Sequence, residues 1–356
     1  MAVTNVLPSY TFGGNEAYDA VPAVVAPYGR KVCIIGGKTA LEKAMPVLEP
    51  VLAASDLEVT GVIVYGTECS FEKGKELAAR EDVQAADVLF AVGGGKAIDT
   101  VKVVSSYQDG KRFFTFPTIA ATCAATSKVA AVYKETHEFD SAYYPPAPAV
   151  HCFINSDILV AAPEKYIWAG MGDTIAKQYE TSFSARNADA PYETEMGVAI
   201  AKMCADPIFR SGVTAMESAK AHERTEAFDR MVLAVVLSTG LASNFLEEDY
   251  NSNAAHAMCY GFTTSHKVEQ NHLHGEIVSY GVLVLLTLDK QTELRDKWIE
   301  IYRQVGWPTK LAHLDITREE MDPVFDKAMV VRDMKVSPYV ITREMLVAAV
   351  EELEAL

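Results

Sequence analysis

The sequence has no pair of cysteines spaced as CxxC, and its six cysteines are scattered along the chain. This pattern argues against a disulfide framework or a cysteine-ligated zinc site, and it suits the reducing cytoplasm. No apolar run reaches the roughly 18 residues that a transmembrane helix needs. The first residues, MAVTNVLPSYTFGGNEAYD, have neither the basic start nor the apolar core of a signal peptide. We therefore expect a cytoplasmic protein without a membrane partner.

The chain also has few positively charged residues relative to its negatively charged ones. The chain has 32 Lys and Arg against 48 Asp and Glu, which gives a formal net charge of -16. A chain this acidic has no general attraction for nucleic acid or for an anionic membrane. We therefore expect neither as a partner, and the acidity by itself says little more about function. The length of 356 residues and the 49% hydrophobic content predict a globular protein with two domains.

Strand and helix patterns alternate in the first part of the chain, as in a parallel sheet with helical crossovers. After Pro163 the pattern is helical, so we expect an α/β domain over 1–160 and an all-helical domain over 161–356. Two further runs, 128–135 and 149–157, flank the Pro-rich 145-PPAP-148 and are expected to pair as a long hairpin. The remaining expected strands are 31–37, 58–66, 87–95 and 113–119, and the expected helices are 39–54, 71–82, 96–108, 164–186, 226–248, 253–262 and 343–356.

Three turns that follow predicted strands have the composition of a phosphate-binding site. In 87-DVLFAVGGGKAIDTVKVV-104, a strand leads through three glycines into a helix, whose first N–H groups and positive dipole end attract anions. The turn is neither a Walker A motif nor a strict GxGxxG, so alone it also fits a tight turn without a ligand. The segments 33-CIIGGKTALEK-43 and 116-FPTIAATCAATSK-128 follow strands in the same way. At the carboxyl ends of parallel strands, the three turns would converge on one crevice, where open α/β sheets bind nucleotides.

Four of the eight histidines lie between His256 and His274. A catalytic zinc usually takes three protein ligands of the His and carboxylate type and leaves one position open. His272 and His274 are two residues apart, so they share a face on a strand but point about 200° apart on a helix, and spacing alone does not choose between them. A carboxylate ligand would come from another helix. Asp173 is the candidate, because a buried carboxylate needs a partner or a cation, although an N-cap role fits it as well.

Five motifs in the same order resemble the iron-containing alcohol dehydrogenase superfamily, and within it the glycerol dehydrogenase and hydroxycarboxylate dehydrogenase branch. They are VGGGKAIDTVK, FPTIAATCAATS, GDTIAK, AAHAMCYGFT and HLHGEIVSYG, and they span nearly the whole chain. The resemblance implies a dehydroquinate synthase-like architecture, with an N-terminal dinucleotide-binding domain and a helical C-terminal domain that holds a divalent metal. It implies an NAD(P)-linked dehydrogenase that acts on the CH–OH group of a small alcohol or reduces the matching carbonyl. Relatives assemble as homo-oligomers, from dimers to octamers.

The resemblance also assigns site residues. Iron-dependent relatives carry a fourth ligand, a histidine four residues after the aspartate, where this chain has Lys177; a three-ligand Zn²⁺ site is the better match. His266 and His272 are left as bystanders. The metal ligands, which also contact the substrate, are Asp173, His256 and His274. The implied cofactor residues are Gly93, Gly94, Gly95 and Lys96 at the pyrophosphate, Asp99 nearby, and Thr118, Ala121, Ser127, Val129 and Tyr133 at the nicotinamide half.

Three positions depart from the pattern of the family. Glycerol dehydrogenases carry a polyol-binding aspartate where this chain has Cys123, and a neutral thiol is no substitute for a carboxylate as an acceptor. The ATCAA run instead resembles the hydroxycarboxylate dehydrogenases, which reduce 2-oxo acids. Relatives often read HAxHNG where this chain has HAMCYG, so Cys259 and Tyr260 change the wall beside the metal. NAD-preferring members have an acid in the first turn; Gly37 and Lys38 here favour NADP, or acceptance of both cofactors.

Four other functions remain open on the sequence. A glycerol dehydrogenase proper is the first. Dehydroquinate synthase shares the architecture but is a lyase, and glycerol-1-phosphate dehydrogenase is a nearer relative; both need a phosphate-binding basic set that the motifs here do not show. A dinucleotide- and metal-binding sensor without activity is the fourth, and the three intact ligand positions argue against it.

Overall fold

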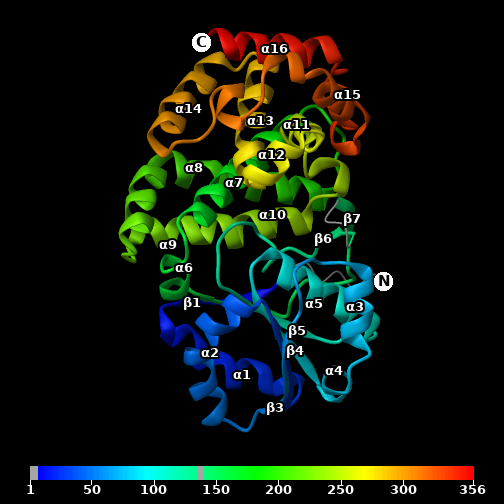
Figure 1. The fold of residues 1–356 in the computed structure, drawn as a ribbon, viewed down its shortest axis with the longest axis vertical. Coiled ribbons are helices and arrows are strands. Elements are labelled where there is room, and N and C mark those ends of the chain that lie inside the picture. Colours follow the sequence, from blue (N-terminus) through cyan, green and yellow to red (C-terminus); the bar gives the residue numbers. More distant parts are fainter. Residues whose placement is uncertain (1–6, 135–138) are drawn as a thin grey trace. The chain divides into compact units, whose positions relative to one another are not determined.

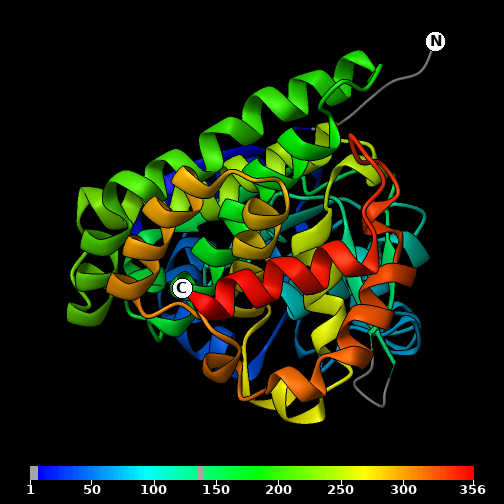
Figure 2. The ribbon, with the colours of Figure 1, turned by 90° about the horizontal axis from the view of Figure 1, so that it is seen from above.

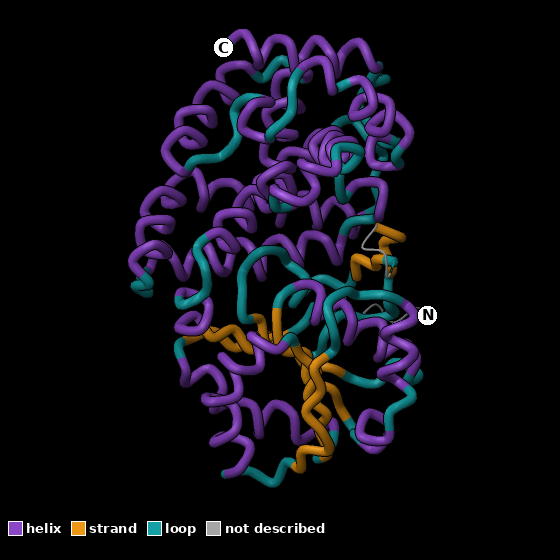
Figure 3. Tube along the Cα trace, viewed as in Figure 1, coloured by secondary structure: helices purple, strands orange, loops and turns teal. Residues whose placement is uncertain are grey.

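The computed structural model describes residues 7–134 and 139–356, so the last residue of the expected strand 128–135 lies outside the described residues. The chain separates into two compact units. One comprises Met1–Pro163 together with His222–Arg224, and the other comprises Glu164–Ala221 and Thr225–Leu356. The first unit holds the strands, and the second is helical (Figure 3). An α/β domain with a parallel sheet followed by a helical domain is the predicted fold class, which is confirmed.

The first unit is built on a six-stranded sheet in which all neighbouring strands are parallel. The four inner strands are buried along almost their whole length, as expected when helices cover both faces of a sheet. In spatial order the strands are β1 (Ser9–Gly13), β8 (His151–Asn155), β5 (Phe113–Pro117), β4 (Val88–Gly93), β2 (Lys31–Gly36) and β3 (Glu58–Val64).

The predicted long hairpin is wrong. β8, which lies within the expected strand 149–157, pairs in parallel with the edge strand β1 on one side and with β5 on the other. The true partner of β6 (Ala130–Tyr133) is β7 (Phe139–Tyr143), in a separate antiparallel pair. All five residues of β8 are buried. A strand whose residues are all buried needs other elements packed on both faces, and an inner position in the large sheet provides them.

Helices cover both faces of the sheet in the first unit. Figure 1 shows α1 and α2 on one side of the strands and α3, α4 and α5 on the other. The side with α1 and α2 holds an aromatic core in which the rings of Phe116 and Phe153 stack with centroids 4.8 Å apart. The expected helix 71–82 is divided in two. The helices are α1 (Val21–Val25), α2 (Lys38–Ala53), α3 (Phe71–Ala78), α4 (Glu81–Ala85), α5 (Gly95–Tyr107) and α6 (Ser156–Val160).

The helical unit is arranged around α13 (His274–Leu288), which packs against α7, α11, α14 and α16. Thirteen of its fifteen residues are buried, so it is apolar all round, as a central helix must be. The long α8 (green) and the C-terminal α16 (red) run across this unit in Figure 2. The other helices are α7 (Lys165–Ser184), α8 (Tyr192–Ala221), α9 (Glu226–Val232), α10 (Thr239–Phe245), α11 (Ala254–Phe262), α12 (His266–Asn271), α14 (Thr292–Val305), α15 (Asp322–Val330) and α16 (Arg343–Ala355).

The expected helix 226–248 contains a π-helical turn, Leu233–Ser238, between α9 and α10. Thr239 closes this turn, because its hydroxyl donates to the carbonyl of Ala234 at 3.0 Å and lies 3.2 Å from the hydroxyl of Thr174. Among the described residues, no helix is both long and apolar enough to cross a membrane.

Candidate functional site

The three turns that the sequence singles out lie together at the carboxyl end of the sheet. The chain leaves β2 towards β3 on one side and leaves β4 towards β5 on the other, so β2 and β4 form a topological switch point. The N–H of Gly37 donates to Val92 O at 3.3 Å, which joins the first turn to the second. The N–H of Thr118 donates to Gly93 O at 3.2 Å, which joins the third turn to the second. The three turns therefore lie side by side in the first unit, as the sequence predicts.

The second turn requires glycine because its backbone lies close to the helix that follows it and to the third turn. Gly93 has a φ of +151°, and a Cβ there would lie 2.8 Å from the Cβ of Ala97. A Cβ on Gly94 would lie 2.5 Å from Cδ1 of Ile119. Within the described residues, no side chain caps the start of α5 at Gly94 or of α2 at Gly37. Their first N–H groups are the kind of donors that bind phosphate.

The side chains around these turns fit a bound dinucleotide in part. The Oγ of Ser127 is buried and has no hydrogen-bond partner among the described residues. Such an atom is costly unless a ligand or water satisfies it. Lys96 forms an ion pair with Glu68, with Nζ and Oε1 2.5 Å apart, and its Nζ lies 5.4 Å from the ring centroid of Tyr133. Cys123 is half-buried, and its carbonyl accepts from the N–H groups of Thr126 and Ser127.

Asp99 is engaged by the protein itself. Its Oδ1 lies 2.7 Å from Nζ of the buried Lys102, and its Oδ2 accepts from the N–H of Ala131 at 3.0 Å. Lys102 also donates to the carbonyl of Val129 at 2.6 Å. Burial raises the pKa of the Asp99 carboxyl, although Lys102 acts in the opposite direction. Asp99 therefore ties α5 to the segment that carries Val129.

The three predicted metal ligands come together in the helical unit. Asp173 lies on α7, His256 on α11 and His274 at the start of α13. Each offers a donor atom, and the three atoms lie within 4.8 Å of one another. The Nε2 atoms of His256 and His274 are 3.4 and 3.6 Å from Oδ1 of Asp173. Two imidazoles and a carboxylate are residue types that divalent metals use as ligands in three-ligand sites.

Glycines beside two of the ligands let the helices approach. Gly172 precedes Asp173, and Gly275 follows His274. A Cβ on Gly275 would overlap the carbonyl of Ala169, and a Cβ on Gly172 would overlap the carbonyl of Gly275. The backbones of α7 and α13 are thus in close contact next to the ligand candidates Asp173 and His274.

Both imidazoles are held at their outer nitrogen. Nδ1 of His256 lies 2.5 Å from Oε2 of Glu180, a fully buried carboxylate that the sequence analysis missed. The available signal was its spacing, because seven residues after Asp173 is about two helical turns on the same face of α7. Nδ1 of His274 lies 3.5 Å from Sγ of Cys259, which is 2% exposed.

The charges at this centre favour a cation. Burial acts to raise the pKa of the Asp173 carboxyl, but hydrogen bonds from His256 and His274 hold the pKa well below its usual range. Burial acts to lower the pKa of His256, but the charge of Glu180 and the hydrogen bond to Asp173 raise it to about 10. For His274, whose side chain is 45% exposed, Cys259 and Asp173 raise the pKa well above its ordinary value. A divalent cation that binds here displaces protons from both rings.

The other two histidines of this part of the chain and Lys177 bind partners outside the proposed metal site. His272 has Nδ1 2.9 Å from Glu276 and Nε2 3.3 Å from Asp315, and His266 is exposed with Nε2 3.3 Å from the side chain of Gln270. Lys177, at the fourth-ligand position, donates to the backbone and side-chain oxygens of Asn251 at 2.7 and 3.0 Å. Of the four histidines in this part of the chain, two are therefore ligand candidates and two make other contacts.

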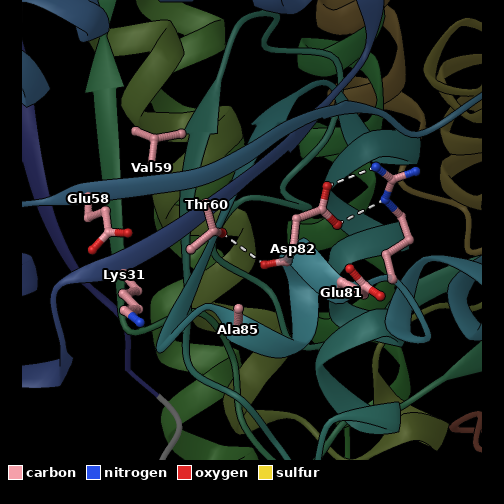
Figure 4. Close-up of a pocket in the computed structure, with 8 residues that line it drawn as sticks. Lys31, Glu58, Val59, Thr60, Glu81, Asp82 and Ala85 are labelled. Carbon is pink, nitrogen blue, oxygen red and sulfur yellow. Dashed lines mark hydrogen bonds and ion pairs between the residues drawn. The ribbon is translucent and has the colours of Figure 1, made fainter.

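A hollow of about 720 Å³ lies at the other end of the sheet (Figure 4). Lys31 and Glu58, which line it, are the first residues of β2 and β3, so it opens at the amino ends of the strands. Two of its charged side chains bind each other, since Arg80 donates to Asp82 through two hydrogen bonds of 3.0 and 2.8 Å. This hollow is therefore separate from the glycine turns, and we do not assign it to the cofactor.

Comparisons with known proteins place the chain in a family. The family model of the iron-containing alcohol dehydrogenases matches residues 8–152. Hydroxycarboxylate dehydrogenase A of Escherichia coli (strain K12) is 29% identical over 90% of this chain and 88% of its own length. Glycerol dehydrogenase of Thermotoga maritima is 32% identical over 74% of this chain and 73% of its own length. The solved structure of glycerol dehydrogenase from Schizosaccharomyces pombe has the same fold, with a TM-score of 0.88 at 23% identity over 100% of this chain and 91% of that one. The chain belongs to the iron-containing alcohol dehydrogenase family.

Proposed function

We propose that this protein is a metal-dependent, NAD(P)-linked dehydrogenase that interconverts a small 2-hydroxy acid and the matching 2-oxo acid. The observation that carries the proposal is the arrangement of Asp173, His256 and His274, whose donor atoms lie within 4.8 Å of one another. The two named relatives, a hydroxycarboxylate dehydrogenase and a glycerol dehydrogenase, support the reaction class.

The donor set fits a divalent cation, and Zn²⁺ is our choice. Two imidazole nitrogens and one carboxylate oxygen suit zinc, and they leave one position open for the substrate oxygen. A bound zinc ion supplies Lewis acid chemistry, which lowers the pKa of a bound hydroxyl or polarises a carbonyl. The part of the protein is to present Nε2 of both rings and Oδ1 of Asp173 to the same point. Lys177 bonds to Asn251, and this favours a three-ligand site over the four-ligand site of iron-dependent relatives.

The glycine turns supply the cofactor site in this proposal. The uncapped starts of α2 and α5 bind the pyrophosphate of the dinucleotide through backbone N–H groups, with Gly93, Gly94 and Gly95 giving the close approach. The buried Oγ of Ser127 gains a partner in the nicotinamide half. Asp99 keeps the segment at Val129 in place. Gly37 and the exposed Lys38 lead us to propose that the enzyme accepts NADP, with a preference for it over NAD.

The substrate class follows from the thiol of Cys123. A carboxylate in this position accepts a hydrogen bond from a polyol, whereas a neutral thiol neither accepts strongly nor repels an anion. This favours a 2-oxo acid. A polyol dehydrogenase is the second candidate, and the similarity to a glycerol dehydrogenase favours it.

A turnover panel tests the proposal. The purified protein, loaded with zinc, is given NADH or NADPH with a set of 2-oxo acids, aldehydes and ketones, and the nicotinamide absorbance is followed. We expect turnover that is highest with a 2-oxo acid, is lost with a chelator and returns with zinc. Cofactor binding without turnover of any compound would contradict the proposal and favour a sensor or a lyase. The homo-oligomer and the cytoplasmic location expected from the sequence belong to the same proposal; light scattering after size exclusion tests the first, and cell fractionation the second.

A further inference from the structure

We propose that Glu180 is a positioning residue of the metal centre: its buried carboxylate sets the ring of His256 so that Nε2 faces the metal-binding point. The inference rests on the proposed metal-dependent function. It adds a residue that neither touches the metal nor belongs to the ligand set.

Glu180 holds two parts of His256 at the same time. Its Oε2 lies 2.5 Å from Nδ1 of the His256 ring. Its Oε1 accepts from the backbone N–H of His256 at 2.9 Å and from that of Asn253 at 2.7 Å. Asn253 directly precedes α11, so one carboxylate fixes both the first turn of this helix and the ring that the helix carries. Glu180 and Asn253 are both fully buried, and no solvent competes for these contacts.

The contact at Nδ1 decides which nitrogen is available to a metal. A carboxylate accepts and cannot donate when it is ionised, so Nδ1 carries the hydrogen in this pair. In the neutral ring the lone pair is then on Nε2, which lies 3.4 Å from Oδ1 of Asp173. Carboxylate–histidine pairs of this type orient metal-binding imidazoles and raise their basicity.

An amide is no substitute for this carboxylate. The pocket presents three donors: the N–H of Asn253, the N–H of His256 and Nδ1–H of the ring. Both side-chain oxygens of residue 180 must therefore act as acceptors. Glutamine supplies one oxygen and one NH₂ group. If the oxygen faces the backbone, the NH₂ faces Nδ1 and requires the other tautomer. If the oxygen faces the ring, the NH₂ faces two N–H groups.

Zinc affinity of the whole apo-protein provides the test. A chelator competes with the protein for zinc, and the titration gives the zinc affinity of each protein. The proteins compared are the unaltered protein, Glu180→Gln and a control, Asp289→Asn. Asp289 is also a carboxylate that is almost fully buried in the helical unit, but its partners are Arg186, Gln291 and Tyr339. We expect Glu180→Gln to weaken zinc binding by about 10- to 100-fold, the range found for second partners of metal-bound histidines. We expect Asp289→Asn to change zinc binding by less than about threefold, although it removes a comparable buried charge.

A spectroscopic readout separates a change in orientation from a general loss of structure. Cobalt in place of zinc reports the ligand geometry through its visible absorption. We expect this absorption to change in Glu180→Gln and to be the same as in the unaltered protein in Asp289→Asn. Glu180→Asp keeps both acceptors on a shorter side chain, so we expect it to bind zinc with an affinity between those of the unaltered protein and the glutamine variant.

The outcomes distinguish this inference from the proposed function. If the unaltered protein binds zinc through His256 and Glu180→Gln binds it equally well, the inference is wrong and the function stands. If the unaltered protein does not bind zinc, or binds it independently of His256, both are wrong. If Glu180→Gln does not fold, Glu180→Asp decides: a folded protein with unweakened zinc binding overturns the inference.

Discussion

Cofactor choice is decided, in our interpretation, by one position in the first glycine turn. Gly37 has a φ of -74° and a ψ of 150°, which any residue adopts, so its backbone does not require glycine. A Cβ there would lie 3.7 Å from Cε1 of Tyr65 and 3.9 Å from the Cβ of Ala40, both ordinary contact distances. Gly37→Asp therefore adds a carboxylate without forcing the turn to move. The variant adds a side chain as well as a charge, so a neutral variant of the same shape is needed as its control.

The magnitude follows from two effects of the carboxylate. At about 6 Å in water, one negative charge repels the two charges of a 2′-phosphate by about 1.4 kcal/mol, and physiological salt reduces this by about half. An ionised carboxylate that accepts from the ribose hydroxyls of NAD contributes about 1.5 kcal/mol or more. The two effects together favour NAD by about 2 kcal/mol. We therefore expect the ratio of kcat/KM for NAD over that for NADP to rise at least about tenfold in Gly37→Asp.

The assay measures kcat/KM for both cofactors with one fixed substrate. Gly37→Asn is the matched control, because it has the same shape without the charge, and we expect it to change the ratio by less than about threefold. Raising the salt concentration must shrink the part of the effect that comes from repulsion. The reasoning is refuted if the unaltered protein already prefers NAD by tenfold, or if the aspartate and asparagine variants behave alike. The selecting contact then lies elsewhere, for example at Glu68, which pairs with Lys96.

Three further predictions concern the metal, the substrate and stability. His274→Ala should remove bound zinc, measured by elemental analysis, together with turnover, whereas His266→Ala should change neither; equal losses in the two variants would show that the wrong histidine was chosen. Cys123→Asp should shift activity from 2-oxo acids towards small polyols, because a carboxylate repels an anion in a site of low dielectric; an unchanged substrate profile would contradict the assignment. Burial lowers the pKa of His151 to about 4. The unfolded chain, with a pKa near 6.5, therefore binds more protons than the folded protein, and the stability present above about pH 6.5 is lost as the pH falls towards 4, by at most about 3 kcal/mol. Denaturant unfolding of the apo-protein at pH 7 and pH 4.5 should show a smaller loss in His151→Gln than in the unaltered protein.

The wrongly predicted hairpin shows where the local sequence pattern stops being informative about strand pairing. The run that contains β8 and the run that contains β6 are close in the sequence and separated by prolines, which is typical of a hairpin. Their actual pairing depends on burial: β8 is covered on both faces and lies between β1 and β5. β1 was not predicted at all, because SYTFG has only five residues and its alternation of polar and aromatic residues is too brief to distinguish a strand from a loop. Parallel pairing joins segments about 140 residues apart, and no local signal encodes that distance.

The histidine pair shows a related limit. His272 follows α12 and His274 begins α13, with extended backbone at His272 and Leu273 between the two helices. Neither the helical nor the strand spacing applies across such a break, so two-residue separation did not choose between the rings. The resemblance to the family selected His274. The packing of α13 on α7, through Gly275 and Gly172, is what brings that ring to Asp173.

By itself, the sequence determined the features that local chemistry encodes. It showed three turns of small residues after buried strands, a carboxylate beside a glycine in an apolar helix, and a cluster of histidines. These features can be recognised locally because a buried strand needs apolar residues and a backbone that binds a ligand closely needs small residues. Only the tertiary structure decided which residues support them. Glu180, Cys259 and Lys102 act through contacts across helices or loops, at distances set by the packing of whole elements. A buried acid, thiol or lysine has no sequence pattern that names its partner, so these roles appear only when the chain is folded.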